Sequence, residues 1–505
     1  MNYSILPSLT TNNILQNLNC YLGIYSELFL IIALSLIISF LVIIDYMYNY
    51  KLILSRISGN LLILTLILEI ILVNNNNSDF FLFEYLLLQD NLTIFVKNIL
   101  LVSLITCIII SYNYIKLEKI VQYEYYILLG LSFLGMLTMV TSNDLITMYL
   151  GIELQSLAFY ILASFKIYNN YSTEAGLKYF ILGAFSSGLL LFGCSLIYGF
   201  TGTTNFHDLQ LLFVTKDIPE EFSSGILLGS TFITVGMLFK LGAAPFQMWL
   251  PDVYDGVPTS VTAVFAIVPK IAIFSLFLRL GLNIFSNNFF FWQQILVYSS
   301  ILSIIIGTLG ALYQVKIKRL LAYSAISHVG FLLIGFSSLN TMSLFAMFFY
   351  IIVYILISIN LFTIILSIRK QDNNLKFKKI NELAILFKSN KLLAINFSII
   401  LFSIAGIPPL VGFYSKLYIF ISAIKSQIYL VAIIAAIFSV IASMYYIRLV
   451  KLMFFKTFDY WAFLCEVPKV NSLVISSTLF FNIFFFCYPE IFVISIYNII
   501  LQLFY

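Results

Sequence analysis

Charged residues are scarce in this sequence. Asp, Glu, Lys and Arg make up 10% of its 505 residues, whereas hydrophobic residues make up 61%. A soluble domain needs far more polar groups to cover its surface, so the composition excludes one. Apolar runs of about 20 residues, the length that crosses the hydrocarbon core of a bilayer, recur from end to end. We therefore predict an all-α, polytopic membrane protein, since a membrane β-barrel would show short alternating segments instead.

Residues that bind metals and redox clusters are also few. The five cysteines stand singly, without a Cys-x-x-Cys pair, and the two histidines, His207 and His328, lie far apart. These patterns argue against an iron–sulfur cluster, a zinc site or a haem. No nucleotide-binding loop follows a strand, because no strands are predicted. We expect the chain to hold no cofactor, so its energy must come from partner proteins or from an ion gradient.

Basic residues are missing from the beginning of the chain, where the first is Lys51. A signal peptide or a mitochondrial presequence would need earlier ones, so neither is expected. Phe, Tyr, Ile and Asn are abundant and Ala is rare, which indicates an AT-rich coding genome and favours synthesis inside an organelle. The net charge of +5 comes from short loops and not from one basic face, so no nucleic acid partner is expected.

Hydrophobic runs predict about fourteen transmembrane helices in a single membrane domain, 1–505. A tail that begins at Pro489 is predicted to lie along the membrane interface, and the polar segment 368–390 is predicted to be a solvated linker. The predicted spans lie near 26–44, 54–73, 92–111, 125–141, 144–165, 176–199, 225–248, 257–281, 292–313, 319–338, 343–367, 391–423, 427–449 and 471–488.

Loop charges predict how the chain crosses the membrane, because basic loops stay on the matrix or cytoplasmic side. Basic loops, such as those at Lys116 and Lys316, alternate with acidic loops, such as the one at Asp208. The alternation predicts both termini on the outer side, which in a mitochondrion is the intermembrane space. Asp252 and Asp255 break the alternation.

Two predicted spans are interrupted. One contains Pro245 in the stretch FKLGAAPFQMWLPDVYDGVP (239–258), and the other contains Pro408 and Pro409 in AGIPPLVGFYSK (405–416). Broken helices in corresponding halves of a transporter indicate inverted repeats with the ion site at the break. We therefore predict two inverted five-helix repeats, each with a broken helix. The predicted divisions are 1–120 (three N-terminal spans), 121–285 (first repeat), 286–450 (second repeat) and 451–505 (last span and tail).

Ionisable side chains occupy the middle of several spans. Such a charge costs at least about 2.5–3.5 kcal/mol at the bilayer centre and usually serves a function. Glu153 lies about 14 Å into its span, with hydroxyl side chains on the same helical face. Ionisable groups that are linked by water form a proton relay. The candidate row is Glu153, Lys240, Lys270, His328 and Lys416.

Structural explanations compete with this one. A buried Glu–Lys pair can simply clamp two helices together, and His328 can be a core histidine with satisfied hydrogen bonds. Lys178 has Glu174 four residues before it, which an ordinary helical ion pair explains. Four further charges lie toward span ends, where snorkelling suffices: Glu27, Glu69, Arg279 and Arg448.

The same residues carry a family resemblance. The chain resembles the antiporter-like membrane subunits of respiratory complex I over roughly residues 150–420, and Lys416 favours the subunit 2 branch over subunits 4 and 5. The matching segments are YLGIELQSLAFYIL (149–162), EAGLKYFILGAFSSG (174–188), YGFTGTTNF (198–206), FKLGAAPFQMWLPDVYDGVPTSVTAVFAIVPKIAIF (239–274), KRLLAYSAISHVGF (318–331) and GIPPLVGFYSKLYIF (406–420).

The resemblance implies roles for residues at matching positions. Glu153 looks like the family's glutamate and Lys240 like its paired lysine, with Lys270, His328 and Lys416 as the later stations of a proton path. Lys178 matches a functional lysine of subunit 2-like chains. Gln247 stands where many relatives carry histidine, so the resemblance implies no proton transfer through that side chain.

The implied function is proton translocation coupled to electron transfer from NADH to ubiquinone. The resemblance places NADH, FMN, the iron–sulfur clusters and ubiquinone in partner subunits. The other partners it implies are membrane lipids and the rest of the membrane arm, including a neighbouring antiporter-like subunit. Two alternatives stay open, namely an Mrp-type cation/proton antiporter subunit and a non-pumping scaffold subunit of the membrane arm.

Overall fold

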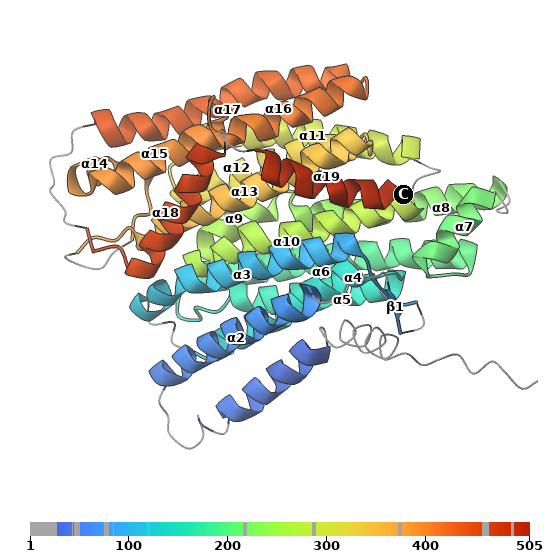
Figure 1. The fold of residues 1–505 in the computed structure, drawn as a ribbon, viewed down its shortest axis with the longest axis horizontal. Helices are drawn as coiled ribbons and strands as arrows, with labels where there is room; N and C mark the ends of the chain where they lie inside the picture. Colours follow the sequence, from blue (N-terminus) through green and yellow to red (C-terminus); the bar gives the residue numbers. More distant parts are fainter. Residues whose placement is uncertain are drawn as a thin grey trace, which may run out of the picture.

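A computed structural model shows the chain as a bundle of long helices that run side by side (Figure 1). Cys20, Cys487 and parts of the first and last predicted spans lie outside the residues that it describes. The described residues are 28–42, 44, 51–74, 80–83, 85–118, 120, 122–215, 220–284, 289–371, 376–456, 464–485 and 489–504.

Helices make up nearly all of the first half. After an apolar helix at Leu28–Val42, they are α2 (Lys51–Asn74), α3 (Asn91–Leu117), α4 (Glu124–Thr141), α5 (Leu145–Ala163), α6 (Asn170–Thr201), α7 (Phe206–Thr215), α8 (Glu220–Leu241), α9 (Trp249–Gly256) and α10 (Thr259–Arg279), followed by the π-helical turn η1 (Leu280–Ile284).

The second half is also helical. Its elements are α11 (Phe289–Leu312), α12 (Ile317–Phe336), α13 (Thr341–Ser367), the 3₁₀ helix η2 (Ile380–Ile385), α14 (Leu386–Ser389), α15 (Lys391–Ala405), α16 (Val411–Lys425), α17 (Tyr429–Phe455), α18 (Lys469–Phe484) and α19 (Glu490–Phe504).

The predicted all-α, polytopic fold is confirmed. Within the described residues, eleven helices are long and apolar enough to cross a membrane. A hairpin of two three-residue strands, β1 (Phe80–Leu82) and β2 (Leu87–Gln89), departs from the expectation of no strands. The predicted number of about fourteen crossings and the inverted repeats stay predictions.

Both predicted interruptions are present. The helix predicted over 225–248 ends at Leu241, and the one predicted over 391–423 ends at Ala405 and starts again at Val411. Each break begins with a glycine in the left-handed region, Gly242 at φ 72° and Gly406 at φ 87°. Glycine ends a helix in this way because it has no Cβ to clash there.

The centre of the bundle is α10, in which every residue is buried. Figure 1 shows the helix Leu28–Val42 and α2 toward one edge and α16 and α17 along the other, with α10, α12 and α13 between them. A helix that is buried on all sides can bring a charged residue such as Lys270 into contact with both halves of the chain.

The two halves pack in similar ways. α4 packs on α5 as α11 packs on α12, and α10 contacts α4 as α17 contacts α11. A Cβ on Gly135 would lie 2.6 Å from the backbone nitrogen of Gln155, and one on Gly307 would lie 2.6 Å from that of Ser327. Gly307 follows Gly135 by 172 residues, and Ser327 follows Gln155 by the same number. The same close contact between two helices therefore occurs at equivalent positions in both halves.

One end of the bundle gathers the basic loops. Glu118, at the end of α3, forms ion pairs with Lys166, with Arg369 at 3.2 Å and with Lys376 at 3.7 Å. Burial raises the pKa of the Glu118 carboxyl, but the three cations lower it further than burial raises it, so it lies below its usual value. Arg369 and Phe377 are buried. This part of the segment predicted to be a solvated linker is therefore docked on the bundle.

The acidic residues that broke the loop pattern lie at the same end. Asp255 forms an ion pair with Lys316 at 2.6 Å, and Asp252 forms ion pairs with Arg319 and with Lys178 at 3.2 Å. Basic residues of α6, of α12 and of the loop before α12 therefore balance the charges of Asp252 and Asp255.

Arg279 does not snorkel as predicted. Its side chain is 6% exposed, and its guanidinium donates to both carboxylate oxygens of Asp90, at 3.2 and 3.1 Å, and to the carbonyl of Ser142 at 3.0 Å. Asp90 also caps the N-terminus of α3 by accepting from the backbone of Thr93. The pair therefore ties the end of α10 to the start of α3.

Replacing Arg279 with alanine should destabilise the protein by about 3 kcal/mol, because it leaves the Asp90 carboxylate without its counterion. The value is at the lower end of the range for buried pairs, since Asp90 is 23% exposed. Thermal unfolding in detergent measures the effect. Arg448→Ala is the control, because Arg448 is exposed and donates to the Leu312 carbonyl; an equal loss in both variants would contradict the assignment.

The cluster around Glu118 predicts a pH dependence. A carboxyl whose pKa is lowered by folding stabilises the folded state fully above its unfolded pKa, near 4.5, and loses that contribution as the pH falls through the folded value. Glu118→Gln should therefore be less stable than wild type at pH 7, and the gap should narrow below pH 4.5. A gap that widens in acid would show that the pKa is not lowered.

Candidate functional site

The first break places Lys240 in the last turn of α8. Its ammonium donates to the hydroxyl of Tyr160 on α5 at 3.4 Å. The Trp249 indole donates to the carbonyl of Phe239 at 3.0 Å, so a carbonyl of the interrupted helix is satisfied from α9. At this break the Lys240 ammonium therefore has a polar neighbour, the Tyr160 hydroxyl.

Glu153 lies on the same side of α5 as Tyr160. Ser156 donates to its carboxylate at 3.5 Å, and the other carboxylate oxygen, Oε1, is buried without a hydrogen bond in the described structure. No ion pair within 4.0 Å joins Glu153 to Lys240 in the part of the chain that the structure describes. The expected ion pair between Glu153 and Lys240 is therefore not formed in the described structure, and a hydroxyl group binds each of the two side chains instead.

Lys270 lies in the middle of α10 and is 5% exposed. Its ammonium donates to the hydroxyl of Tyr354 on α13 at 2.9 Å and lies 4.7 Å from the centre of that ring. The Tyr354 hydroxyl donates in turn to the carbonyl of Ala266 at 3.2 Å, one turn before the lysine. A cation over a tyrosine face is stabilised even without a carboxylate.

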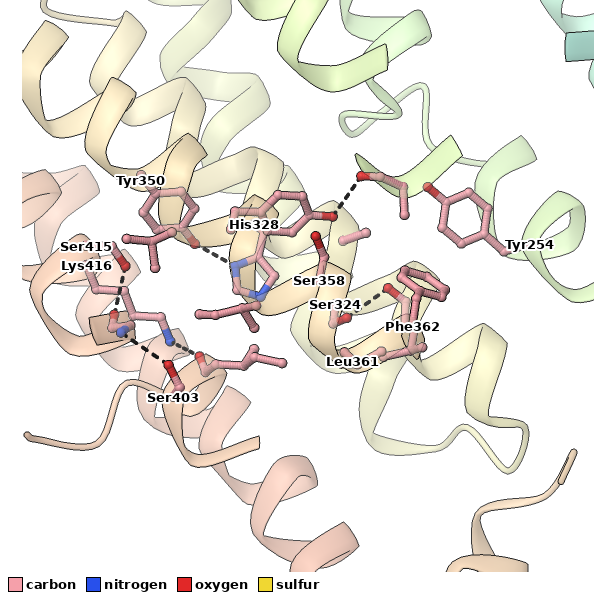
Figure 2. Close-up of a pocket in the computed structure, with 18 residues that line it drawn as sticks. Tyr254, Ser324, His328, Tyr350, Ser358, Leu361, Phe362, Ser403, Ser415 and Lys416 are labelled. Carbon is pink, nitrogen blue, oxygen red and sulfur yellow. Dashed lines mark hydrogen bonds between the residues drawn. The ribbon is translucent and has the colours of Figure 1, made fainter. Parts of the chain in front are cut away.

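His328 meets another tyrosine of α13. Its Nδ1 lies 2.6 Å from the hydroxyl of Tyr350, and its ring centre lies 5.5 Å from that of Tyr354 (Figure 2). Tyr350 and Tyr354 are four residues apart on one helix, so they share a face. α13 therefore presents one hydroxyl to the lysine of α10 and one to the histidine of α12.

The second break places Lys416 against the end of a helix. The ammonium donates to the carbonyls of Ile404 and Ala405, at 2.8 and 2.9 Å, where α15 stops. These carbonyls carry the negative end of the helix dipole, which favours a cation. The Lys416 ammonium also lies 5.6 Å from the centre of the Phe331 ring.

Two cavities lie along the row. The first, about 30 Å³, is lined by Lys240, Lys270 and Ser156, and the second, about 50 Å³, is lined by His328, Lys416 and Tyr354 (Figure 2). A water molecule needs about 10–15 Å³ of such volume and polar partners. Both cavities are therefore large and polar enough for water. Tyr254 lines both.

Lys178 is the one predicted site residue that stays outside this row. Its side chain is 44% exposed, and its ammonium pairs with Glu174 at 2.7 Å and with Asp252 at 3.2 Å. The helical pair with Glu174, which the sequence indicated, is present. Asp252 also binds Arg319 on α12, so Lys178 is joined to the second half of the chain at the basic end.

Sequence reasoning missed the tyrosine partners of the row. Tyr350 and Tyr354 lie on α13, which reads as an apolar span, and their four-residue spacing was the available signal. It also missed Lys97, which is fully buried in α3. Among the described residues, no group of three His, Cys, Asp or Glu side chains is placed to hold a metal ion.

Known proteins share this architecture. A family model described as NADH:quinone oxidoreductase/Mrp antiporter, TM, matches residues 142–442. NADH-ubiquinone oxidoreductase chain 2 of Marchantia polymorpha is 48% identical over 406 residues, which cover 80% of this chain and 82% of that one. NADH-quinone oxidoreductase subunit N of Rhodospirillum rubrum is 42% identical over 373 residues, 74% of this chain and 76% of that one.

A solved structure gives the same fold. A chain of respiratory complex I from Thermus thermophilus superposes with a TM-score of 0.76 at 24% identity and covers 92% of this chain and 99% of its own length. At that identity, the likeness concerns the fold.

The contact between Gly406 and Lys416 generates a prediction. A Cβ on Gly406 would lie 3.1 Å from Cδ and 3.2 Å from Nζ of Lys416, on a backbone at φ 87°. Gly406→Ala should therefore cost about 1–2 kcal/mol in unfolding free energy from the backbone alone. Thermal unfolding measures it.

Gly188→Ala is the matched control for that measurement. Gly188 lies inside α6, and a Cβ there would meet nothing within 4 Å, so the change should be neutral or stabilising by up to about 1 kcal/mol. If Gly406→Ala were as harmless as Gly188→Ala, the left-handed backbone of Gly406 at the second break would be refuted.

Proposed function

The chain belongs to the NADH:quinone oxidoreductase/Mrp antiporter family of membrane subunits, and we propose that its row of buried ionisable side chains is the path by which a proton crosses the membrane. The observation that supports this most strongly is the pair of polar cavities, which between them are lined by Lys240, Lys270, His328 and Lys416.

The chain is a membrane-arm subunit of the proton-translocating NADH:quinone oxidoreductase, respiratory complex I, and lies among its other membrane-arm subunits. It is a multi-pass protein of the inner mitochondrial membrane. The Mrp-type alternative is weaker, since the relatives named above are NADH:quinone oxidoreductase chains. The resemblance drawn from the motifs is thereby confirmed.

The proposed path begins at Glu153 and Lys240. The two charged groups do not contact each other. The Ser156 hydroxyl binds the Glu153 carboxylate, and the Tyr160 hydroxyl binds the Lys240 ammonium. A structural change that brings the carboxylate nearer would hold the proton on Lys240, and one that withdraws it would release the proton. Glu153 is therefore proposed as the residue that senses the neighbouring antiporter-like subunit, and Lys240 as the first lysine to respond.

The middle of the path runs through α10. Lys240 and Lys270 line one cavity, and His328 and Lys416 line the other. A proton released from Lys240 into the first cavity reaches Lys270 through water, and His328 then receives it in the second cavity. Water supplies the connections, because protons pass along hydrogen-bonded chains that side chains alone do not complete.

Lys416 ends the proposed path. The two carbonyls at the end of α15 hold its ammonium, so a proton that arrives there is stabilised until a change at the break withdraws them. Against a membrane potential, each proton costs about 2.3 kcal/mol per 100 mV. The energy must reach this residue from the redox reaction through neighbouring charges.

We propose that Lys178 serves the path from the basic surface. Its ammonium is exposed and bound to Asp252 on α9, close to the first break. This position supports a role in proton uptake, or in holding α9, instead of a place in the buried row.

We also propose that NADH, FMN, the iron–sulfur clusters and ubiquinone bind partner subunits, since this chain has few residues of the kinds that hold them. The outward placement of both termini rests on the loop charges, and the clustering of basic loops at one end supports it. Organelle encoding rests on composition alone.

The repeated glycine contacts of α4 with α5 and of α11 with α12 support the proposed repeats over 121–285 and 286–450. The proposed three-span start, 1–120, and the last span with its tail, 451–505, flank them. α18 and α19 pack on α13 and α3.

Lys240→Ala and Lys416→Ala should each lower the number of protons pumped per NADH oxidised, while the complex assembles and NADH oxidation continues. Purified complex in liposomes, with a pH-sensitive dye inside, measures the ratio. Lys425→Ala is the control, because Lys425 is exposed at the far end of the same helix as Lys416. If pumping is unchanged in both variants, the chain is a scaffold and not a proton path.

A further inference from the structure

Tyr354 occupies the boundary between the two cavities. Its hydroxyl accepts from Lys270, which lines the first cavity, and its side chain lines the second cavity with His328 and Lys416. Lys270 does not line the second cavity, and His328 does not line the first. A proton that moves from Lys270 to His328 therefore meets the hydroxyl of Tyr354 where it passes from the first cavity into the second, a point called the crossing.

In this structure the hydroxyl proton of Tyr354 is bound to a backbone carbonyl at the wall of the second cavity, since Ala266 lines that cavity. It is donated to the Ala266 carbonyl at 3.2 Å, which can accept a hydrogen bond but cannot pass a proton on. Because a phenol hydroxyl rotates about its C–O bond, the same proton can turn to a water molecule in the second cavity. The crossing is closed in one orientation and open in the other.

Resting on the proposed function, we infer that Tyr354 transfers the proton between Lys270 and His328 and that its bond to the Ala266 carbonyl keeps the crossing closed. In the open orientation, the Tyr354 oxygen takes a proton from the Lys270 ammonium as its own hydroxyl proton passes to a cavity water. That water then protonates His328. Lys270 ends neutral, His328 ends charged, and the tyrosine is unchanged.

The other tyrosines near the row do not have this position. Tyr350 binds His328 but no lysine, and Tyr160 binds Lys240 but lines neither cavity. Tyr254 lines both cavities, but no hydrogen bond in the described structure joins its hydroxyl to Lys270 or His328. Tyr354 alone among these four contacts a lysine from one cavity and lines the other.

Tyr354→Phe tests the inference, because it removes the hydroxyl and keeps the ring over which the Lys270 ammonium lies. The complete complex in liposomes is assayed for protons pumped per NADH oxidised. The expected result is the same loss that Lys270→Ala causes, with assembly and NADH oxidation retained. The double variant should lose no more than either single variant, since both remove one step of one path.

Tyr126→Phe is the matched control, because it removes the hydroxyl of a buried tyrosine on α4, away from the row. It should pump as wild type does. If Lys270→Ala lowers the ratio and Tyr354→Phe does not, the inference is overturned and the proposed path stands. If neither lowers it, the proposed path itself is refuted, and the inference with it.

Discussion

A charge in the middle of a membrane needs a partner, and this constraint shapes the interior of the protein. None of Lys240, Lys270 and Lys416 forms an ion pair with a carboxylate in the described structure. Their partners are tyrosine hydroxyls, aromatic faces and the carbonyls at the end of a broken helix. These neutral partners stabilise the charged form of a lysine less strongly than a carboxylate does. A lysine bound in this way can therefore lose and regain its proton.

The broken helices follow from the same constraint. An intact helix in lipid satisfies all of its own backbone groups and offers none to a side chain. Where the helices stop, at Leu241 and at Ala405, backbone carbonyls accept hydrogen bonds from side chains. The donor is Trp249 at the first break and Lys416 at the second. The lysine precedes the break in the first half and follows it in the second, so the two sites are related but not identical. α13 supplies what the breaks do not, namely two hydroxyls at the centre of the row.

The features that depend on residues close together in the chain could be predicted from the sequence alone. Pro245, and Pro408 with Pro409, predicted both breaks, and the rarity of charge in the spans marked the lysines. Partners far away in the chain could not be predicted. Tyr354 is 84 residues from Lys270, and Asp90 is 189 residues from Arg279, so the hydroxyl contact was missed and Arg279 was wrongly expected to snorkel. The distance between Glu153 and Lys240 depends on how α5 and α8 each pack against α6, which no local pattern encodes.

In the proposed path, the two cavities are joined by water through the centre of the bundle. A structure of the complete complex, at a resolution that shows ordered water, tests it most directly. Water molecules should occupy both cavities, hydrogen-bonded to Lys240 and Lys270 on one side of Tyr354 and to His328 and Lys416 on the other. Dry cavities, or apolar side chains filling the space between Tyr354 and Lys416, would contradict it.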